Sequence, residues 1–400
     1  MSTGPARISA GDARVKVLAT PKDPNPYQEL LYREVAREGA VVRYATGPTP
    51  SQTVNLLLAP LVLAVQRARG FRILHIHWVF QFDIPWARGA RPARVVMQWW
   101  FGLYLLVAAR LGFRIVWTAH DILPHAPVFR DDEKAHALLR ERADVVIALS
   151  PATAAQLVEL GARDVRVVPF GPYGGAVPGA PTGEDARELL HLEVEDFVVV
   201  SIGRQEHYKG ADLLLEAASE AAPGSRLVVL LAGVCSDPRF RARLDELAGR
   251  AGARARVRLE WVPDEELVTY FAAADFAAYP FREVTNSSSV LLAQSFGVPV
   301  IIPNLPSLAD VAAGSVIRYE PGEFRSAVER AEALGDAERA QMGRRAREHA
   351  CGVTWNDVAR ATMDAYSDAL GRPSARLREV VGHEGHARTG PAARAARDST

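Results

Sequence analysis

Residues 279–306 read YPFREVTNSSSVLLAQSFGVPVIIPNLP, and this stretch determines how the rest of the sequence is interpreted. A predicted strand ends at Pro280, a polar loop follows, and an apolar helix is closed by Gly297. The first N–H groups of a helix lack partners within it, and the helix dipole places partial positive charge there. Two interpretations follow for the polar turn: it binds a phosphate, or it only caps a structural helix. A phosphate would bind at residues 286–289, and the capping residues would be Thr285, Asn286, Ser287 and Ser288.

The length and composition indicate two α/β domains. The chain has 400 residues, more than one ordinary domain, and its 47 basic and 47 acidic residues balance. A balanced charge does not favour broad electrostatic binding, so no nucleic-acid partner is expected. Two cysteines, Cys235 and Cys351, are too few for a disulfide framework or a cysteine-based zinc site, and they fit a reducing cytosol.

The N-terminus and the most apolar run bear on localisation. The N-terminus lacks the apolar core of a secretory signal, so a cytoplasmic protein is expected. The most apolar run, residues 99–109, has about half the length needed to span a bilayer. We interpret this run as a buried helix, with the alternative that it forms a surface in peripheral contact with the inner face of the membrane.

Short β-branched runs alternate with longer helical patterns in both halves of the chain, which is typical of βαβ units and parallel sheets. The predicted strands are 15–19, 41–44, 73–77, 115–119, 145–148 and 165–168, then 197–202, 226–232, 257–260, 276–279 and 298–302. The predicted divisions are a first Rossmann-like domain at 14–168, a linker leading into the second domain at 169–195, a second Rossmann-like domain at 196–353, a helix at 354–370 and a disordered tail at 371–400. Such folds bind ligands at the carboxyl ends of their strands, so we expect a cleft between the two sheets.

Two cations follow the first predicted strand of the second domain. Arg204 comes directly after Gly203, and Lys209 precedes the next helix. Each positive charge about 4 Å from an anion contributes roughly 4 kcal/mol at an effective dielectric of 20, so the pair can hold a diphosphate. The alternative is a solvated charge pair in a loop. The sequence contains no Asp-x-Asp, so we expect no metal ion and no other cofactor.

Several segments occur in an order that resembles the family 4 glycosyltransferases. They are HIHW at 75–78, VWTAHDILPH at 116–125, VVPFGPY at 167–173, LLAG at 230–233, VPDEELVTYFAAADFAAYPF at 262–281 and GVPV at 297–300. The Trp-Thr-x-His segment followed by Pro-His is similar to a bacterial subgroup of this family. The resemblance implies the GT-B fold, in which two Rossmann-like domains face each other across a cleft. In this fold the last helix, here within VTWNDVARATMDAY at 353–366, packs back on the first domain.

The resemblance also assigns roles to individual residues. The diphosphate-binding Arg and Lys of the family correspond to Arg204 and Lys209, and its catalytically important histidine corresponds to His120. The alternative for His120 is a structural histidine at a strand end. Asp121 and Asp83 are candidate bases if the reaction inverts configuration, although each is also typical of a turn or cap.

Three residues are expected on the acceptor side of the cleft. Tyr27 belongs to NPYQELLY at 25–32, which stands where other members of the family have a Gly-Gly loop. His77 and Trp78 follow a predicted parallel strand, together with His75. For these residues of HIHW, a place in the core is an equally good interpretation.

One departure from the family pattern concerns two glutamates eight positions apart. Leu292 occupies the second position and Val284 the first, so the ribose contact expected from the second glutamate is lost. Glu283 is one residue from the first position and is a candidate replacement. The departure leaves the nucleotide open and weakens the inference of a retaining mechanism, which the resemblance favours over inversion.

The resemblance therefore implies a glycosyltransferase that moves a hexosyl group from a GDP- or UDP-sugar to a hydroxyl group. The acceptor would be a polysaccharide or glycolipid precursor or a small natural product. The alternative is a catalytically inactive protein on the same fold, disabled by Leu292, that binds a nucleotide sugar or a glycan. Release of nucleoside diphosphate separates the two.

Overall fold

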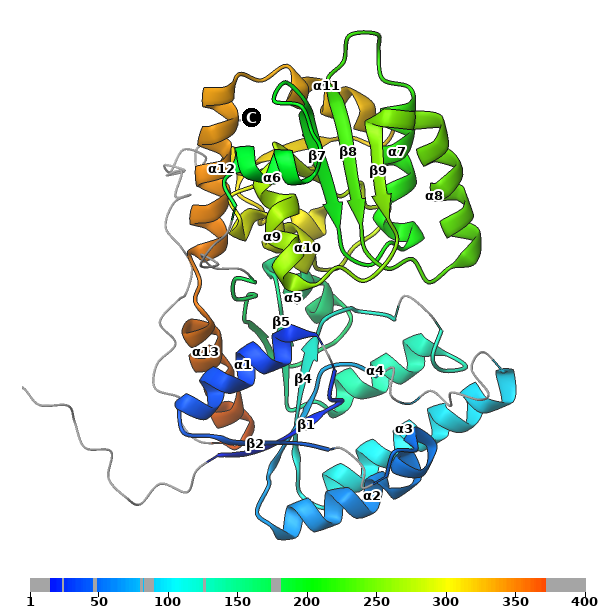
Figure 1. Ribbon diagram of the computed structural model, residues 1–400. Helices are drawn as coiled ribbons and strands as arrows, with labels where there is room; N and C mark the ends of the chain where they lie inside the picture. Colours follow the sequence, from blue (N-terminus) through cyan, green and yellow to red (C-terminus); the bar gives the residue numbers. More distant parts are fainter. Residues whose placement is uncertain are drawn as a thin grey trace, which may run out of the picture.

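The structure is a computed structural model that describes residues 15–23, 25–45, 49–79, 82, 90–124, 127–173 and 181–371. These residues form two six-stranded sheets in which every pairing is parallel. The first sheet has the order β2-β1-β3-β4-β5-β6 and the second the order β12-β11-β10-β7-β8-β9. Figure 1 shows the two sheets in separate halves of the molecule, each with helices on both sides. The α/β, two-domain GT-B fold predicted from the sequence is confirmed.

The strands are short and mostly buried, as expected for parallel sheets covered on both faces. The first sheet consists of β1 (Lys16–Thr20), β2 (Val41–Tyr44), β3 (Ile73–Ile76), β4 (Arg114–Ala119), β5 (Val145–Ala148) and β6 (Val165–Val167). The second consists of β7 (Phe197–Ile202), β8 (Leu227–Ala232), β9 (Ala255–Arg258), β10 (Phe276–Ala278), β11 (Val300–Pro303) and β12 (Val316–Tyr319). The central strands β7 and β8 are buried along their whole length.

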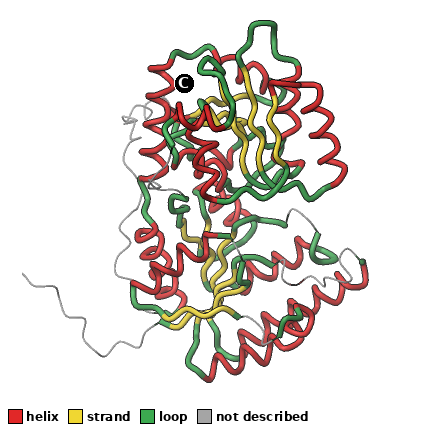
Figure 2. The backbone as a smooth tube through the Cα atoms, viewed as in Figure 1, coloured by secondary structure: helices red, strands yellow, loops and turns green. Residues whose placement is uncertain are grey.

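Helices cover both faces of each sheet (Figure 2). The helices of the first domain are α1 (Pro26–Arg37), α2 (Gln52–Ala68), α3 (Arg91–Arg110), α4 (Asp132–Arg142) and α5 (Pro151–Glu159). Those of the second are α6 (Gly183–Leu189), α7 (Ala211–Ser219), α8 (Pro238–Ala251), α9 (Asp264–Ala273), α10 (Ser288–Ser295), α11 (Phe324–Glu332) and α12 (Asp336–Cys351). A short 3-10 turn, η3 (His207–Lys209), precedes α7. Within the described ranges, no helix has the length and apolar character needed to cross a membrane.

The last helix, α13 (Trp355–Ala369), returns to the first domain and packs beside α1, as expected (Figure 1). Its N-terminus is held because the Trp355 indole donates a hydrogen bond to the carbonyl of Pro172 (2.8 Å). Near its other end, Asp368 pairs with Arg166 of β6 (3.1 Å). The helix thereby ties the C-terminal part of the chain to the N-terminal sheet.

The stretch between the sheets contains a helix that the sequence interpretation did not include. Thr182 and Asp185 form a capping box, in which each side chain accepts a hydrogen bond from the other residue's backbone N–H, and this starts α6. Ala186 is fully buried and α6 packs against α9, so this part of the predicted linker belongs to the core of the second domain. The predicted tail lies outside the described residues apart from Gly371.

Candidate active site

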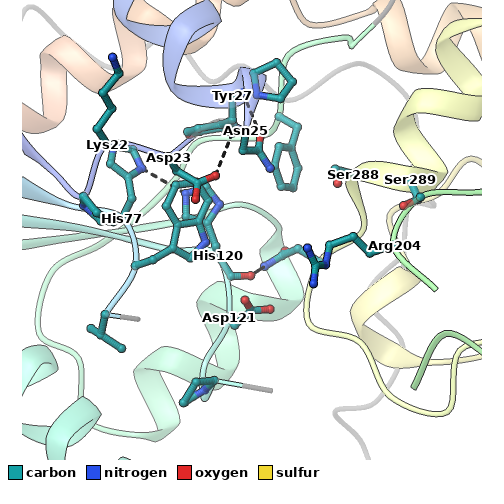
Figure 3. A pocket seen from close by; sticks show the side chains of 18 of the residues that line it. Lys22, Asp23, Asn25, Tyr27, His77, His120, Asp121, Arg204, Ser288 and Ser289 are labelled. Atoms are coloured by element: carbon teal, nitrogen blue, oxygen red, sulfur yellow. Dashed lines mark hydrogen bonds between the residues drawn. The ribbon is translucent and has the colours of Figure 1, made fainter. Parts of the chain in front are cut away.

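A cavity of about 2140 Å³ lies between the two domains, where the carboxyl ends of both sets of strands meet. Its first-domain wall includes Tyr27, His77, Trp78, His120 and Asp121, and its second-domain wall includes Gly203, Arg204, Lys209, Glu283, Asn286, Ser288 and Ser289. Figure 3 shows the labelled residues of the two walls facing each other, with Arg204 extending towards the first domain. Most of the predicted site residues are therefore brought together. Thr285 and Ser287 do not border the cavity, and Asp83 lies outside the described residues.

The turn after β7 leaves open space beside the cations because two glycines meet there. Gly203 has a φ of +124°, and a Cβ on it would lie 3.3 Å from both Lys209 Nζ and Ser289 Oγ. Gly233 follows β8 with a φ of +129°, and a Cβ there would overlap the carbonyl oxygen of Gly203. The two turns approach closely enough for backbone and cations to face one ligand group.

The two cations of this wall are held differently. Lys209 Nζ donates a hydrogen bond to Ser289 Oγ (3.3 Å), and burial lowers the pKa of Lys209 to about 8, with a smaller contribution from Arg204 and an opposing one from Glu206. Arg204 is 67% exposed, donates to Ser236 Oγ (3.1 Å) and lies 3.4 Å from Glu206. Lys209 is thus a partly buried charge at the cavity wall that an anion would stabilise, whereas Arg204 can turn towards a ligand at little cost.

The residues of the polar turn before α10 have different roles. The hydroxyl of Ser287 accepts a hydrogen bond from the N–H of Val290 (3.2 Å), so Ser287 caps the helix. Ser288 and Ser289, in the first turn, border the cavity, and Ser289 accepts the hydrogen bond from Lys209. The capping interpretation thus applies to Ser287, whereas phosphate binding at the first turn of α10, which borders the cavity, stays a prediction.

Asn286 makes contacts that were not expected for a donor-binding residue. Its amide nitrogen donates to the carbonyl oxygen of His120 (3.0 Å), and its amide oxygen accepts from Thr153 Oγ1 of α5 (3.1 Å). Both partners belong to the first domain. Asn286 therefore joins the two walls and fixes the backbone of His120 relative to the donor side.

A buried chain of hydrogen bonds runs from His120 into the first domain. His120 Nε2 shares a hydrogen bond with His77 Nδ1 (3.1 Å), and His77 Nε2 shares one with the Tyr32 hydroxyl (2.6 Å). The Tyr32 hydroxyl lies 3.0 Å from His75 Nδ1, which the Tyr366 hydroxyl of α13 also contacts at 2.7 Å. On the other side of its ring, His75 Nε2 shares a hydrogen bond with Thr118 Oγ1 (2.8 Å). One consistent direction of donation along the chain determines whether Nδ1 of His120 is a donor or an acceptor.

The histidines of this chain are neutral at physiological pH. Burial lowers the pKa of His120 and of His75 to about 3, and burial together with the neighbouring histidines lowers the pKa of His77 well below its usual value. Trp78 stacks on the His120 ring with centroids 4.1 Å apart, and Tyr27 meets its edge at 4.8 Å. His120 is therefore an oriented, uncharged hydrogen-bonding group at the cavity wall.

One of the two altered family positions lies at this wall. Leu292 of α10 borders the cavity, whereas Val284 does not, and its neighbour Glu283 does. The loop of Glu283 is fixed because Arg282 makes a two-pronged ion pair with Asp212 (2.9 and 2.8 Å). Within the described part of the chain, no group of three or more His, Cys, Asp or Glu side chains is arranged to hold a metal ion.

Comparison with known proteins shows which family has this architecture. Residues 8–171 match the family model "Glycosyltransferase Family 4", and residues 184–349 match "Glycosyl transferases group 1". D-inositol 3-phosphate glycosyltransferase 2 of Catenulispora acidiphila is 31% identical over 318 residues, which cover 75% of this chain and 71% of the relative. The chain belongs to the family 4 glycosyltransferases.

Further relatives of this glycosyltransferase carry similar names. The D-inositol 3-phosphate glycosyltransferase of Xylanimonas cellulosilytica is 27% identical over 88% of this chain and 93% of the relative. That of Nocardia farcinica is 33% identical, but the match covers 57% of this chain and only 53%, about half, of the relative.

Solved structures share the fold of this glycosyltransferase at low sequence identity. Sucrose-phosphate synthase from Thermosynechococcus elongatus has a TM-score of 0.68 at 18% identity and covers 90% of this chain and 100% of its own. HepE of Anabaena, solved with UDP-glucose, has a TM-score of 0.64 at 18% identity and covers 90% of this chain and 100% of its own. At these identities the similarity shows the fold alone.

Two residues of the site were not identified from the sequence. Tyr32 and Tyr366 lie in the two segments quoted for the resemblance at 25–32 and 353–366, but no pattern connects them to His75.

Proposed function

We propose that this glycosyltransferase moves a hexosyl group from a nucleotide diphosphate sugar to a hydroxyl of a polysaccharide or glycolipid precursor or a small natural product. The observation that carries the proposal is the composition of the two cavity walls. Arg204 and Lys209 on one wall suit a diphosphate, and neutral His120 on the other suits a sugar hydroxyl. The donor would lie across the cavity, with its diphosphate at the first turn of α10 and its sugar near His120.

In the proposed reaction the bond from the anomeric carbon to the diphosphate oxygen breaks with its electron pair, and the acceptor oxygen bonds to that carbon. The acceptor proton leaves with the diphosphate, so the products are a glycoside and a nucleoside diphosphate. Arg204 and Lys209 stabilise the negative charge that develops on the leaving group and so take the part that a metal ion plays in other sites.

We infer that configuration is retained. Inversion requires a base opposite the leaving group, and a histidine with a pKa of about 3 is a weak base, so Asp121, which also borders the cavity, would have to serve. With retention, which the family resemblance favours, the leaving diphosphate is the group that accepts the proton, on the face from which it departs. The anomeric configuration of the product, read by proton NMR, tests this inference.

We further infer a reducing, cytoplasmic setting, because Cys235 and Cys351 are both unpaired thiols. Oxidation state after purification from a native source tests this setting.

The decisive experiment is a donor screen followed by turnover. UDP-glucose enters first, since HepE of Anabaena was solved with it, and GDP-mannose represents the other nucleotide. Thermal shift reports binding, and release of nucleoside diphosphate reports transfer to a set of acceptors that includes D-inositol 3-phosphate, after which the relatives are named. Binding of a donor without release by any acceptor favours the alternative, an inactive binding protein.

The Leu292→Glu variant sharpens that experiment. Leu292 borders the cavity, so a glutamate there could reach a ribose hydroxyl. A variant that begins to turn over where the natural chain does not would show that Leu292 had disabled an otherwise complete site. Leu292→Gln, of equal size but uncharged, is the matched control.

A further inference from the structure

Helix α2 exposes an apolar face to solvent. Val54, Leu57, Leu61 and Val65 are spaced by three, four and four residues, which places them on one side of the helix. Leu57 is 61% exposed and Leu61 is 60% exposed. Leu63 and Leu56, on the other side, are buried in the domain. The helix is thus apolar on both sides.

Helix α3 repeats this pattern beside α2. Val96, Trp99 and Leu103 are exposed at a spacing of three and four residues, and Trp99 is 79% exposed. The two helices run side by side because the Trp100 indole donates to the carbonyl of Leu56 (2.9 Å). At their other ends, Arg67 Nε donates to the carbonyl of Leu111 (2.8 Å). Figure 1 shows α2 and α3 together on the part of the first domain farthest from the second sheet.

The seven residues Val54, Leu57, Leu61, Val65, Val96, Trp99 and Leu103 are called here the apolar face. A surface helix of a globular protein normally presents charged and polar side chains to water, whereas neither α2 nor α3 contains an acidic residue. Contiguous apolar surface of this kind marks a binding partner rather than solvent.

The charge around the apolar face is strongly positive. Between Thr49 and Val116 the sequence has eight arginines, no lysine and one acidic residue, although the charges of the whole chain balance. Arg91 and Arg110 stand exposed at the two ends of α3, and Arg69 and Arg72 stand exposed just after α2. Arg114 is also exposed, although it pairs with Asp144 (2.9 Å). The apolar face is therefore flanked at both ends by positive charge.

We propose that the apolar face docks this protein on an anionic phospholipid bilayer. Apolar side chains would enter the boundary between headgroups and acyl chains, and the flanking arginines would meet lipid phosphates. Trp99 is the residue type favoured at that boundary. The opposite sides of α2 and α3 are buried in the first domain, so the two helices would lie parallel to the membrane surface.

Docking in this orientation would bring the site next to the membrane. Asn55, Leu56, Ala59 and Val62 of α2 line the cavity from the side that the apolar face does not use. An acceptor sugar on a lipid carrier could therefore enter beside α2 while its lipid stays in the bilayer. This last step rests on the proposed function, whereas the docking itself does not.

Vesicle flotation tests the docking without any turnover. The full chain is mixed with vesicles of phosphatidylcholine alone or with phosphatidylglycerol added, and the bound fraction is measured. We expect binding to the anionic vesicles that weakens as salt is raised. Combining Leu57→Gln, Leu61→Gln and Trp99→Gln should weaken it at least about tenfold, and combining Arg91→Gln with Arg110→Gln should reduce binding to anionic vesicles only.

The matched control replaces exposed apolar residues elsewhere. Combining Val158→Gln, Leu189→Gln and Val194→Gln alters side chains of similar exposure away from α2 and α3, so this variant should bind vesicles like the natural chain. Single Trp99→Gln serves if the triple variant does not fold, and it should still weaken binding.

Three outcomes would overturn the proposal. The natural chain could fail to bind anionic vesicles, or the apolar-face variant could bind as well as the control. Alternatively, the natural chain could self-associate in analytical ultracentrifugation without binding vesicles, and the apolar-face variant could lose this self-association. The apolar face would then be an interface between copies of this chain. Vesicle binding with no transfer to any acceptor would reject the proposed function and leave the docking intact.

Discussion

Replacing Lys209 by methionine should stabilise the free protein and strongly weaken its donor binding. Met is apolar and similar in length, so it removes the poorly solvated charge without leaving a cavity. The pKa of Lys209 is lowered from 10.5 to about 8 by burial, which corresponds to a cost of up to about 3 kcal/mol for the protonated form, at about 1.36 kcal/mol per pKa unit. Lys209→Met should therefore raise the free energy of unfolding at pH 7 by up to that amount.

The sign of the pH dependence follows from the same shift. Below pH 8 the lysine is protonated in both states, and the folded state carries the full desolvation cost. Between pH 8 and 10.5 the unfolded chain binds more protons, so the natural protein gains stability as the pH rises. The variant should lack this gain, and urea unfolding of both proteins at pH 7 and pH 10 measures the difference.

Donor binding should change in the opposite direction. A lysine about 4 Å from a diphosphate contributes roughly 4 kcal/mol at an effective dielectric of 20, so its loss should weaken donor binding about 10³-fold. Calorimetry on both proteins measures the donor Kd. Lys134→Met is the matched control, since the Lys134 side chain is 80% exposed and pairs only with Asp131 on the same helix.

The reasoning would be refuted by a Lys209→Met protein that binds the donor normally. It would be refuted equally by a variant that is less stable than the natural chain at pH 7, because Lys209 would then stabilise the fold instead of serving to bind an anion.

Four further outcomes are expected. Arg204→Ala should abolish transfer with little loss of stability, because the side chain is largely exposed, and thermal melting with turnover separates the two effects. His120→Ala should lower kcat by roughly 10² or more with little change in donor Kd. His120→Asn should have a milder effect because it keeps a hydrogen bond. Steady-state kinetics and a separate binding measurement test this, and a kcat near that of the natural protein would contradict it. The free energy of unfolding should fall as the pH drops below 6.5, by about 2 kcal/mol at pH 5 for each of His75 and His120. The reason is that the unfolded chain binds protons on these histidines at pH 5, whereas the folded chain does not. Urea unfolding at pH 7 and pH 5 measures the difference. Transfer should persist in EDTA, and complete, reversible loss would show that a divalent metal is required.

Most strands could be predicted from the sequence because strand formation leaves a short-range pattern of residues. The runs that became β2, β5 and β7 were predicted with the bounds that the structure shows, since each is rich in β-branched residues. β12 was not predicted, although its sequence VIRY resembles the VVRY of β2, so the local pattern was a usable signal. α6 was not predicted, because the Gly- and Pro-rich composition before it masked the capping box at Thr182.

The site was predictable to the extent that it lies at strand ends. Residues at the carboxyl ends of parallel strands must meet at one edge, and this rule placed His120 and Arg204 at the same cavity. The partners of His75 could not be predicted in this way. Tyr366 lies 291 positions further along the chain, and only the packing of α13 on the first domain brings the two together.

Asn286 shows why the two walls of the site depend on each other. Its amide donates to the carbonyl of His120 and accepts from Thr153, and the next residue, Ser287, caps the helix whose first turn faces Lys209. Any change in the turn before α10 would therefore shift the donor side and His120 together. Because Nε2 of His120 is bound to His77, its Nδ1 is the ring nitrogen left for a ligand, and the backbone contact from Asn286 helps to fix where that nitrogen points. The proposed separation of donor binding from catalysis by domain is thus incomplete: the second domain, which carries the proposed diphosphate site, also positions the histidine of the first.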